Sequence, residues 1–301
     1  MDFFMNKIIP WFLASRPKTL TAAFTPIFVG TAVAMVALKP SGEKVNWNLS
    51  LLALLASIFI QIGTNFVNDA LDFKKGADND KRIGPKRVAQ SGLLTPKQVI
   101  FGGFLSFFIA ILFGLPLVFQ GGIFILAIGI ISLICGYLYT GGPYPLAYVG
   151  LGELFVILFF GLAAVGGVFY IHTGYFTLPA FVAGLQIGLL ATVLISINNF
   201  RDFKGDKTVG KMTLAARFGK KFARFEIVSL FSMTYLLNIF WIYEGHRAAA
   251  LLSFLSLPIA ILVINGILFQ EPSKIFNKYL GMSALVQIIF GILMGIGFII
   301  G

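Results

Sequence analysis

Residues 99–140 read VIFGGFLSFFIAILFGLPLVFQGGIFILAIGIISLICGYLYT and contain no charged side chain. An α-helix rises about 1.5 Å per residue and the bilayer core is about 30 Å thick, so about 20 apolar residues make one crossing. This run is therefore long enough for two membrane-spanning helices, which we place at 99–119 and 122–140. It predicts an integral membrane protein.

The rest of the chain has the same character. Of its 301 residues, 58% are hydrophobic and 12% are charged, and the mean hydropathy is +0.91. A soluble domain carries about a quarter charged residues, so this composition excludes a water-soluble globular protein as well as a disordered or collagen-like chain. The apolar runs of crossing length give nine predicted spans, at 19–38, 49–67, 99–119, 122–140, 151–170, 179–199, 225–243, 248–269 and 280–300.

The predicted fold class is an all-α, polytopic membrane bundle of nine transmembrane helices. Continuous apolar runs, as opposed to alternating ones, favour helices over a β-barrel. Residues 1–301 are expected to form a single integral-membrane domain. Within it, residues 1–18 are apolar but interrupted by Pro10, which predicts a segment lying at the membrane interface.

The distribution of basic residues predicts the orientation of the chain. Lys and Arg number 23 against 12 acidic residues, a net charge of +11. If the N-terminus is cytoplasmic, 20 of the 23 lie on that side of the nine predicted spans and 3 on the other. The positive-inside rule then predicts a multi-pass protein of the inner or plasma membrane. Its N-terminus and the loops at about 68–98 and 200–224 are cytoplasmic, and its C-terminus is outside.

Half of the 12 acidic residues lie in two short stretches after predicted spans two and six: NFVNDALDFKKGADND at 65–80 and NNFRDFKGDKTVGK at 198–211. Helical spacing places oxygen-bearing side chains of each stretch on one face. They are Asn65, Asn68 or Asp69, and Asp72 in the first stretch, and Asn198, Asp202 and Asp206 in the second. Carboxylate and amide oxygens suit Mg²⁺, which commonly shares its coordination between carboxylates and substrate phosphates. We therefore expect Mg²⁺ as a cofactor and a diphosphate as its partner.

Basic residues surround both acidic stretches. Residues 69–97 carry 7 basic and 4 acidic side chains, and residues 201–224 carry 8 basic and 2 acidic ones. Such a basic entrance attracts a polyanion, and Lys211 and Arg87 are the predicted direct contacts of the diphosphate. Basic loops also satisfy the orientation rule and bind anionic lipid headgroups, which is the alternative interpretation of any single Lys or Arg.

Polar residues inside two of the spans predict a cavity. Gln61–Gly63–Asn65 and Ser196–Asn198–Asn199 precede the acidic stretches, and polar groups within a span usually face the interior of a bundle. A partly polar cavity between spans two and six, open to the cytoplasm, is the expected result. A metal-bound diphosphate beside such a cavity, in a chain with 33 Phe, favours one reaction. The diphosphate leaves an allylic carbon, and a nucleophile captures the cation that aromatic faces stabilise.

These motifs resemble the UbiA-type intramembrane aromatic prenyltransferases. The resemblance rests on Asn65-x-x-Asn68-Asp69-x-x-Asp72-x-x-x-Gly76-x-Asp78, on Asn198-Asn199-x-Arg201-Asp202-x-x-x-Asp206, and on Gly210-Lys211-x-Thr213-Leu214. The stretches GPKRVAQSGLLTP, YTGGPYPLAYVGLGE and GKMTLAARFG look most like the branch that prenylates 1,4-dihydroxy-2-naphthoate in menaquinone biosynthesis. The resemblance implies a nine-helix bundle around a central cavity and a Mg²⁺-dependent prenyltransferase. That enzyme joins a polyprenyl group to the aromatic acid, with decarboxylation, to give demethylmenaquinone.

The resemblance also implies roles for individual residues. The metal ligands would be Asn68, Asp69, Asp72, Asp202 and Asp206, the four aspartates being catalytic, with Asn65 and Asp78 assisting. The phosphates would be steadied by Lys211, Arg87 and Lys81. Tyr139 would be catalytic, near the reacting carbon, or else an interfacial anchor. The second motif supplies Asn198, Asn199 and Arg201 as further substrate-binding residues, and Arg201 would meet either the substrate carboxylate or a neighbouring aspartate.

Two other functions fit the same motifs, because the motifs contain residues for binding the diphosphate and not for recognising the acceptor. The same chemistry could act on another aromatic acceptor, such as 4-hydroxybenzoate, homogentisate or a tetrapyrrole. A non-enzymatic carrier of prenyl diphosphates would also need a basic, metal-assisted pocket. The expected partners are the isoprenyl diphosphate, the aromatic acid and membrane lipid, and no nucleic acid.

Overall fold

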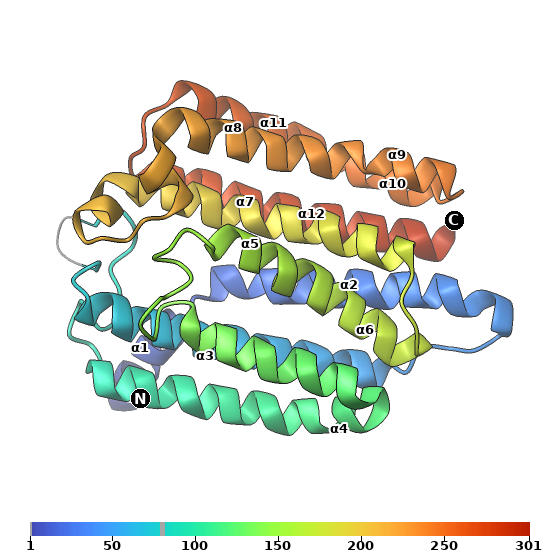
Figure 1. The fold of residues 1–301 in the computed structure, drawn as a ribbon, viewed down its shortest axis with the longest axis horizontal. Helices are drawn as coiled ribbons and strands as arrows, with labels where there is room; N and C mark the ends of the chain where they lie inside the picture. The colour runs from blue at the N-terminus through green and yellow to red at the C-terminus, as the bar shows by residue number, and fades with distance from the viewer. Residues whose placement is uncertain (1, 79–81) are drawn as a thin grey trace.

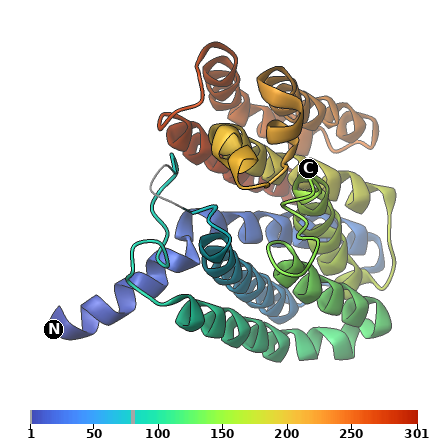
Figure 2. The same ribbon diagram turned by 60° about the vertical axis from the view of Figure 1, so that its left-hand side comes forward.

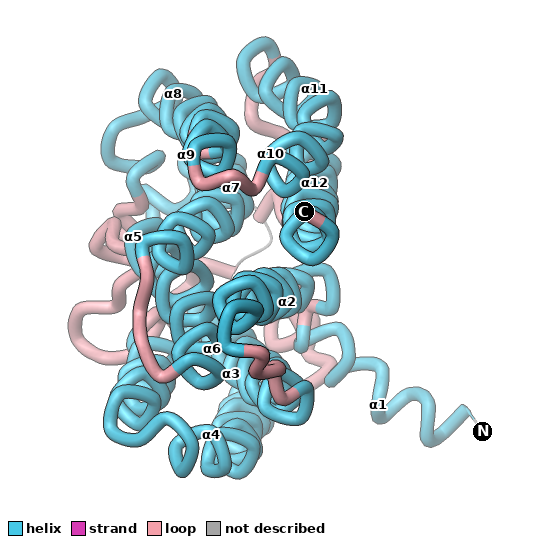
Figure 3. The backbone as a smooth tube through the Cα atoms, turned by 90° about the vertical axis from the view of Figure 1, so that its right-hand side faces the viewer, coloured by secondary structure: helices cyan, strands magenta, loops and turns pink. Residues whose placement is uncertain are grey.

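The protein is described by a computed structural model that covers residues 2–78 and 82–301, with side chains for 8–17, 19–78 and 82–301. Within those residues the chain consists of helices and loops, with no β-strand (Figure 1, Figure 3). This confirms the all-α prediction. The helices are α1 (Asp2–Ser15), α2 (Pro17–Leu38), α3 (Trp47–Lys74), α4 (Pro96–Leu138), α5 (Gly152–Val156), η2 (Ile157–Ala163), α6 (Ala164–Thr173), α7 (Leu178–Thr208), α8 (Leu214–Leu236), α9 (Asn238–Tyr243), α10 (Arg247–Ser253), α11 (Leu257–Phe269) and α12 (Phe276–Ile300). Two short 3₁₀ turns, η1 (Lys39–Ser41) and η3 (Phe254–Ser256), join some of them.

Eight helical segments in the described chain are long and apolar enough to cross a membrane. The longest of them, α4, contains both spans predicted at 99–119 and 122–140. Its helix is interrupted at Gly122, where φ is 60° and ψ is −147°, a conformation that a residue without Cβ adopts readily. The two arms of α4 run in opposite directions (Figure 1). Counted as two arms, α4 brings the described helices into agreement with the nine predicted spans.

Glycines let both arms of α4 approach α3 closely. A Cβ on Gly63 of α3 would lie 2.5 Å from the ring of Phe107 and 3.0 Å from the carbonyl oxygen of Gly103, both on the first arm. A Cβ on Gly136 of the second arm would lie 2.7 Å from Thr64 Oγ1. Small residues at helix contacts are how membrane helices associate, because lipid supplies little hydrophobic driving force between them.

Helix α7 lies at the centre of the bundle and contacts α2, α8, α12 and η2. Ile187, Val193 and Ile197 are fully buried along it. Gly184 and Gly188 form a small-xxx-small pair against which Gly161 of the π-helical segment η2 packs, so that a Cβ on Gly161 would lie 2.7 Å from Gly188 Cα. This close crossing holds the span formed by α5, η2 and α6 against α7.

The two ends of the bundle differ. The N-terminal helix, the acidic stretch after α3 and the segment between α7 and α8 lie at one end, and the C-terminus lies at the other (Figure 1). We call the first of these the motif end. Helix α1 extends away from the bundle there (Figure 2), with Ile8 and Phe12 exposed and Trp11 packed on Phe66 of α3. Exposed apolar residues on a projecting helix fit the interfacial segment predicted for residues 1–18, which stays a prediction.

Candidate active site

The two acidic stretches come together at the motif end. Lys211 Nζ lies 3.5 Å from Asp72 Oδ2 and 3.9 Å from Asp206 Oδ1, so the two carboxylates are separated by no more than the sum of these distances. Although burial alone would lower it, the two carboxylates raise the pKa of Lys211 above its ordinary value. This lysine therefore links the first motif to the second as a charged ammonium.

A second cation links the same two stretches. The guanidinium of Arg82 forms an ion pair with Asp78 and lies 3.8 Å from Asp202 Oδ2. Arg87 approaches the other oxygen of Asp78, at 3.7 Å. Burial raises the pKa of Asp78 in spite of these neighbouring guanidiniums. Asp78 thus organises two arginines of the loop that follows α3.

Asp72 projects into the site from the last turn of α3 and is almost fully buried. The hydroxyl of Tyr148 donates a hydrogen bond of 2.8 Å to its Oδ1. Tyr148 belongs to the loop between α4 and α5, and its ring also carries Lys75 Nζ over its face at 4.5 Å from the centroid. Burial and the charge of Asp72 raise the pKa of Tyr148, so the tyrosine stays a hydrogen-bond donor. The hydrogen bond from Tyr148 thus fixes Oδ1 of Asp72, while Oδ2 faces Lys211.

Asp69 has a different environment from the one expected of a metal ligand. Its two oxygens accept backbone hydrogen bonds of 3.1 Å from Val88 and Ala89, and it does not line the cavity described below. Adjacent residues on a helix point about 100° apart, because there are 3.6 residues per turn. Asn68 lines the cavity while Asp69 faces the loop. In this structure Asp69 therefore holds the segment that carries Arg87.

Arg201 pairs with the neighbouring aspartate, one of the two partners predicted for it. Its Nε and Nη2 bind the two oxygens of Asp202, at 3.0 and 2.5 Å. Nη2 also donates to Asn198 Oδ1 at 2.8 Å, and Nη1 donates to Asn277 Oδ1. Gly84 packs directly on this guanidinium, with no room for a Cβ. Arg201 is thus a buried clamp on the second motif.

The amides of both motifs are anchored on the cavity wall. Asn65 donates through Nδ2 to the carbonyl oxygen of Ser15, at 3.0 Å, which ties α3 to the α1–α2 junction. Asn199 donates through Nδ2 to Glu153 Oε1 at 2.8 Å. Both asparagines and Asn198 line the cavity. Lys81, a further predicted phosphate contact, lies outside the described residues.

A cavity of about 510 Å³ extends from this cluster into the bundle. Its walls are mostly apolar along α2, α4 and η2. Its charged lining residues gather at the motif end, and they are Arg16, Asp72, Arg82, Arg87 and Lys211. One end of the cavity therefore suits a charged group and the remainder suits a hydrocarbon. This matches the cavity expected between spans two and six.

Three arginines at the charged end have buried nitrogens without a hydrogen-bond acceptor among the described residues: Nε and Nη2 of Arg16, Nε of Arg82 and Nε of Arg87. Burial, together with Arg16 and Arg82, lowers the pKa of Arg87 well below its ordinary value. Leaving a buried donor unpaired costs about 1–3 kcal/mol, and more when it is charged. A bound anion with several oxygens would satisfy all three guanidiniums at once.

The donor set also fits a hard cation accompanying that anion. In the part of the chain that the structure describes, no three His, Cys, Asp or Glu side chains are grouped closely enough to hold a metal ion alone. Asp72, Asp202 and Asp206 nevertheless gather around two cations, and Asn68 Oδ1 is buried without a partner. Oxygen ligands of this kind, completed by phosphate oxygens, suit Mg²⁺. The residues therefore fit a metal that arrives with a diphosphate.

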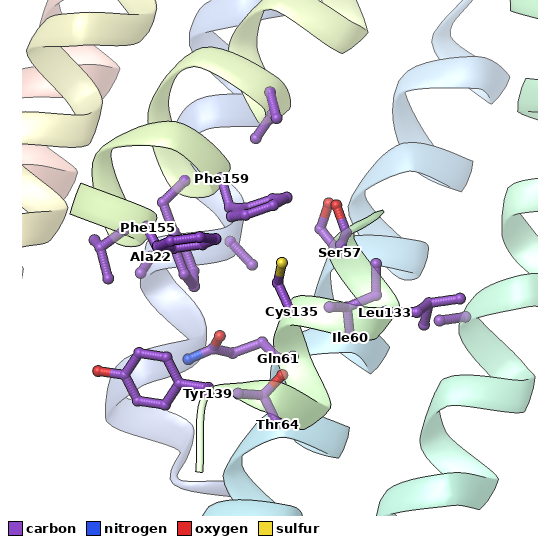
Figure 4. A pocket seen from close by; sticks show the side chains of 18 of the residues that line it. Ala22, Ser57, Ile60, Gln61, Thr64, Leu133, Cys135, Tyr139, Phe155 and Phe159 are labelled. Atoms are coloured by element: carbon purple, nitrogen blue, oxygen red, sulfur yellow. The ribbon is translucent and has the colours of Figure 1, made fainter. Parts of the chain in front are cut away.

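Tyr139, the residue that follows α4, lines the cavity. Its hydroxyl would be 3.1 Å from a Cβ on Gly152, so a larger residue there would crowd it. Tyr139 thus places its phenol on the cavity wall (Figure 4).

Sequence reasoning missed Arg16 and Tyr148. Arg16 has φ +53°, the only positive φ outside glycine in the described chain, and this turn between α1 and α2 directs it into the cavity. A non-glycine residue in this region costs energy and often marks a functional position. The available signal was its place directly before Pro17, because helices usually end at or before the residue that precedes a proline. Tyr148 had no signal beyond its place in a loop at the motif end.

Comparison with known proteins gives concordant matches. Residues 24–298 match the model of the UbiA prenyltransferase family. A 1,4-dihydroxy-2-naphthoate octaprenyltransferase of Haemophilus influenzae is 33% identical over 307 residues, covering 98% of this chain and 97% of the relative. A protein of the same name from Bacillus subtilis is 32% identical, covering 95% of this chain and 91% of the relative.

Solved structures show the same fold. The apo structure of a UbiA homolog from Aeropyrum pernix K1 superposes with a TM-score of 0.69 at 18% identity, covering 92% of this chain and 96% of that one. A UbiA homolog from Archaeoglobus fulgidus, solved with DMAPP and Mg²⁺, superposes with a TM-score of 0.59 at 16% identity and covers 94% and 98% of the two chains. The helical membrane architecture is thereby shared across the described chain.

Proposed function

The chain belongs to the UbiA prenyltransferase family, and we propose that it transfers a polyprenyl group from an isoprenyl diphosphate to 1,4-dihydroxy-2-naphthoate. Relatives about one-third identical over nearly the whole chain carry the name 1,4-dihydroxy-2-naphthoate octaprenyltransferase. The observation that carries the proposal is the cavity itself. It joins guanidiniums that have buried nitrogens without an acceptor, and the carboxylate cluster around Lys211 and Arg82, to a long apolar interior. A prenyl diphosphate has the same two-part chemistry.

Asn68, Asp72, Asp202 and Asp206 are the proposed holders of Mg²⁺ on the diphosphate. A divalent ion there would neutralise charge on the leaving diphosphate as its bond to carbon breaks. We assign Asp69, predicted as a fifth ligand, to holding the Val88–Ala89 backbone, because its oxygens accept the amides of these two residues. Asp72, Asp202 and Asp206 instead pair with Lys211 or Arg82, the two cations that connect the motifs. Asp78 holds Arg82 and Arg87 in the same loop.

Lys211 and the three cavity arginines bind the diphosphate and stabilise the negative charge that develops on it. Two unit charges 4 Å apart interact by about 4 kcal/mol at an effective dielectric of 20, so several such contacts contribute substantially to lowering the barrier. The bond from the allylic carbon to oxygen breaks, and its electron pair goes to the diphosphate. The ring carbon bearing the carboxylate forms the new bond, and carbon dioxide leaves, returning its electron pair to the ring.

The test is the identity of the product. The purified protein, reconstituted in nanodiscs with Mg²⁺, is supplied with dihydroxynaphthoate and a defined prenyl diphosphate, and the product mass is measured. We expect the mass of the acceptor minus carbon dioxide plus one prenyl group. If product forms only with 4-hydroxybenzoate or homogentisate, dihydroxynaphthoate is the wrong acceptor. If the protein binds the prenyl diphosphate without turnover, it is a carrier and not an enzyme.

Truncation of Lys211 should act on the donor substrate. Lys211→Ala removes an ammonium 3.5 Å from Asp72, and a charge-assisted contact contributes about 1.5–3 kcal/mol. We expect the KM for the prenyl diphosphate to rise about tenfold or more, with the KM for the aromatic acid unchanged. Lys221→Ala, on an exposed residue of the same basic segment, is the matched control and should leave both unchanged. If the two variants have equal effects, Lys211 does not bind the diphosphate directly and contributes only to the general positive charge of the segment.

We also propose that the motif end faces the cytoplasm, in the inner or plasma membrane. The charge asymmetry of the sequence supports this, because 20 of the 23 Lys and Arg fall on that side of the nine spans. In a Cys135→Ser background, Lys221→Cys at the motif end and Glu43→Cys at the opposite end provide thiols for labelling. An impermeant maleimide added to intact cells should label only the second variant. Labelling of only the first would invert the orientation.

A further inference from the structure

Helix α3 carries a row of polar side chains that continues beyond the charged end of the cavity. Ser57, Gln61, Thr64 and Asn68 all line the cavity, and their spacing of four, three and four residues places them on one helical face. At 1.5 Å per residue, Gln61 lies about 10 Å along the helix from Asn68. A diphosphate held at Asn68 and Asp72 does not extend that far into the bundle.

Gln61 has no hydrogen-bond partner among the described residues, although it is half-buried inside a membrane-spanning helix. Gln186, on α7, provides the contrast. Its Nε2 donates to the Thr234 carbonyl oxygen and to Asn238 Oδ1, and its Oε1 accepts from Trp241. An unpaired amide in an apolar interior is costly. A glutamine that serves packing is satisfied as Gln186 is, whereas Gln61 presents both its donor and its acceptor to the cavity.

Aromatic rings form the facing wall. Phe155 and Phe159 are stacked, with centroids 5.9 Å apart and an interplanar angle of 20°, and both line the cavity. They flank the start of the π-helical segment at Ile157, and single π-helical turns often occur at functional positions. Figure 4 shows Gln61, Cys135, Phe155 and Phe159 directed toward one shared space, with Tyr139 beside it.

The prenyl chain of the donor has a different wall of the cavity to lie against. The first arm of α4 and the start of the second line the cavity with Ile111, Leu115, Leu117 and Ile125, none of which offers a hydrogen bond. Flat aromatic faces opposite an unpaired amide instead suit a flat ring that carries hydroxyl groups. The cavity therefore has an apolar wall for the prenyl chain and a separate, mixed wall.

We propose that the aromatic acceptor binds between Gln61 and the Phe155–Phe159 pair, with the Gln61 amide hydrogen-bonded to the ring hydroxyl farthest from the carboxylate. The proposal rests on the function proposed above and names the part of the cavity that selects the acceptor. In this position the carboxylate-bearing side of the ring faces the charged end, where the allylic carbon of the donor is held. Gln61 is thus a specificity-determining residue.

Gln61→Leu removes the amide and keeps a similar volume. We expect the KM for the aromatic acceptor to rise about tenfold, because one hydrogen bond to the acceptor is lost. The KM for the prenyl diphosphate should stay constant. Phe159→Leu should also change the KM for the aromatic acceptor. The assay uses whichever aromatic acceptor the wild-type protein prenylates. If that acceptor is not dihydroxynaphthoate, the proposed function is overturned, but the role of Gln61 is still tested.

Two controls separate binding from folding. Leu115→Ala, on the apolar wall, should change the KM for a long prenyl diphosphate and leave the KM for the acceptor unchanged. Gln186→Leu should lower the melting temperature and leave both KM values unchanged. If Gln61→Leu is poorly folded, Gln61→Asn, which keeps the amide but shortens its reach, should still raise the acceptor KM selectively. A rise in the donor KM alone, or equal rises in both, would overturn the proposal.

The hydroxyl contact has its own readout. The wild-type protein should bind 1-hydroxy-2-naphthoate, which lacks the remote hydroxyl, about tenfold more weakly than an inhibitor that retains both hydroxyls. Gln61→Leu should bind the two equally, because the amide that distinguishes them is gone. The same tenfold discrimination in the variant would place the hydroxyl elsewhere.

Discussion

Asp72→Asn is expected to reduce kcat by about 10²–10³-fold while the protein remains folded in the membrane, a loss of the size seen when one preorganised electrostatic contact is removed. Asparagine has nearly the same shape and can still accept the hydrogen bond from Tyr148. It removes only the negative charge that faces Lys211 at 3.5 Å. The measurement is single-turnover product formation under saturating substrates.

Tyr148→Phe is the matched control for that variant. It deletes the 2.8 Å hydrogen bond to Asp72 but leaves the charge, so kcat should fall by a smaller factor than in Asp72→Asn. We expect about tenfold, the lower end of the range for one hydrogen bond to a charged group. Equal kcat in wild type and Asp72→Asn would remove Asp72 from the reaction. A loss accompanied by a lower melting temperature or by aggregation would mark Asp72 as structural.

Chelation of divalent ions should abolish turnover, and added Mg²⁺ should restore it. Without a divalent cation, the carboxylates of Asp72, Asp202 and Asp206 would compete with the diphosphate for Lys211 and Arg82. They would also repel the diphosphate, since two like unit charges 4 Å apart interact by about 4 kcal/mol at an effective dielectric of 20. The measurement is the initial rate after EDTA treatment and dialysis, followed by Mg²⁺ titration. EDTA presaturated with Mg²⁺ is the control and should leave the rate unchanged. Full activity in the dialysed, metal-free protein would contradict the assignment.

The sequence predicted the fold well because a bilayer imposes a length on each helix. Runs of about 20 apolar residues located the spans, including the two within residues 99–140 that Gly122 separates. Other features depend on contacts between distant segments. The π-helical segment at Ile157–Ala163 is one, since its closest neighbours are Gly184 and Gly188 of another helix, and nothing in its own composition distinguishes it from α-helix.

The same division holds for the site. Helical spacing placed the acidic residues of each motif on one face, and the structure brings Asp72, Asp202 and Asp206 around shared cations. Spacing alone did not decide between Asn68 and Asp69, which point in different directions from α3. The loop amides that occupy Asp69 come from Val88 and Ala89, about 20 positions along the chain. Their approach is a tertiary contact that a local pattern does not encode.

Arg16 illustrates what charge counting hides. In the sequence it is one of 20 basic residues on one side of the membrane, and the orientation rule explains it fully. Only its left-handed backbone and its buried, unpaired nitrogens distinguish it from a solvated arginine. Arg201 shows the converse, because one of its two predicted partners, the neighbouring aspartate, forms a bidentate pair with it.

The central claim is that the two acidic motifs and the buried cations form one site for a metal-bound diphosphate. The most direct measurement is an anomalous diffraction map of the protein crystallised with Mn²⁺ and a non-hydrolysable prenyl thiolodiphosphate. We predict Mn²⁺ peaks at coordination distance from Asp72 and from Asp202 or Asp206, with the diphosphate contacted by Lys211 and Arg87. Mn²⁺ bound away from both motifs, or a diphosphate outside the cation cluster, would contradict it.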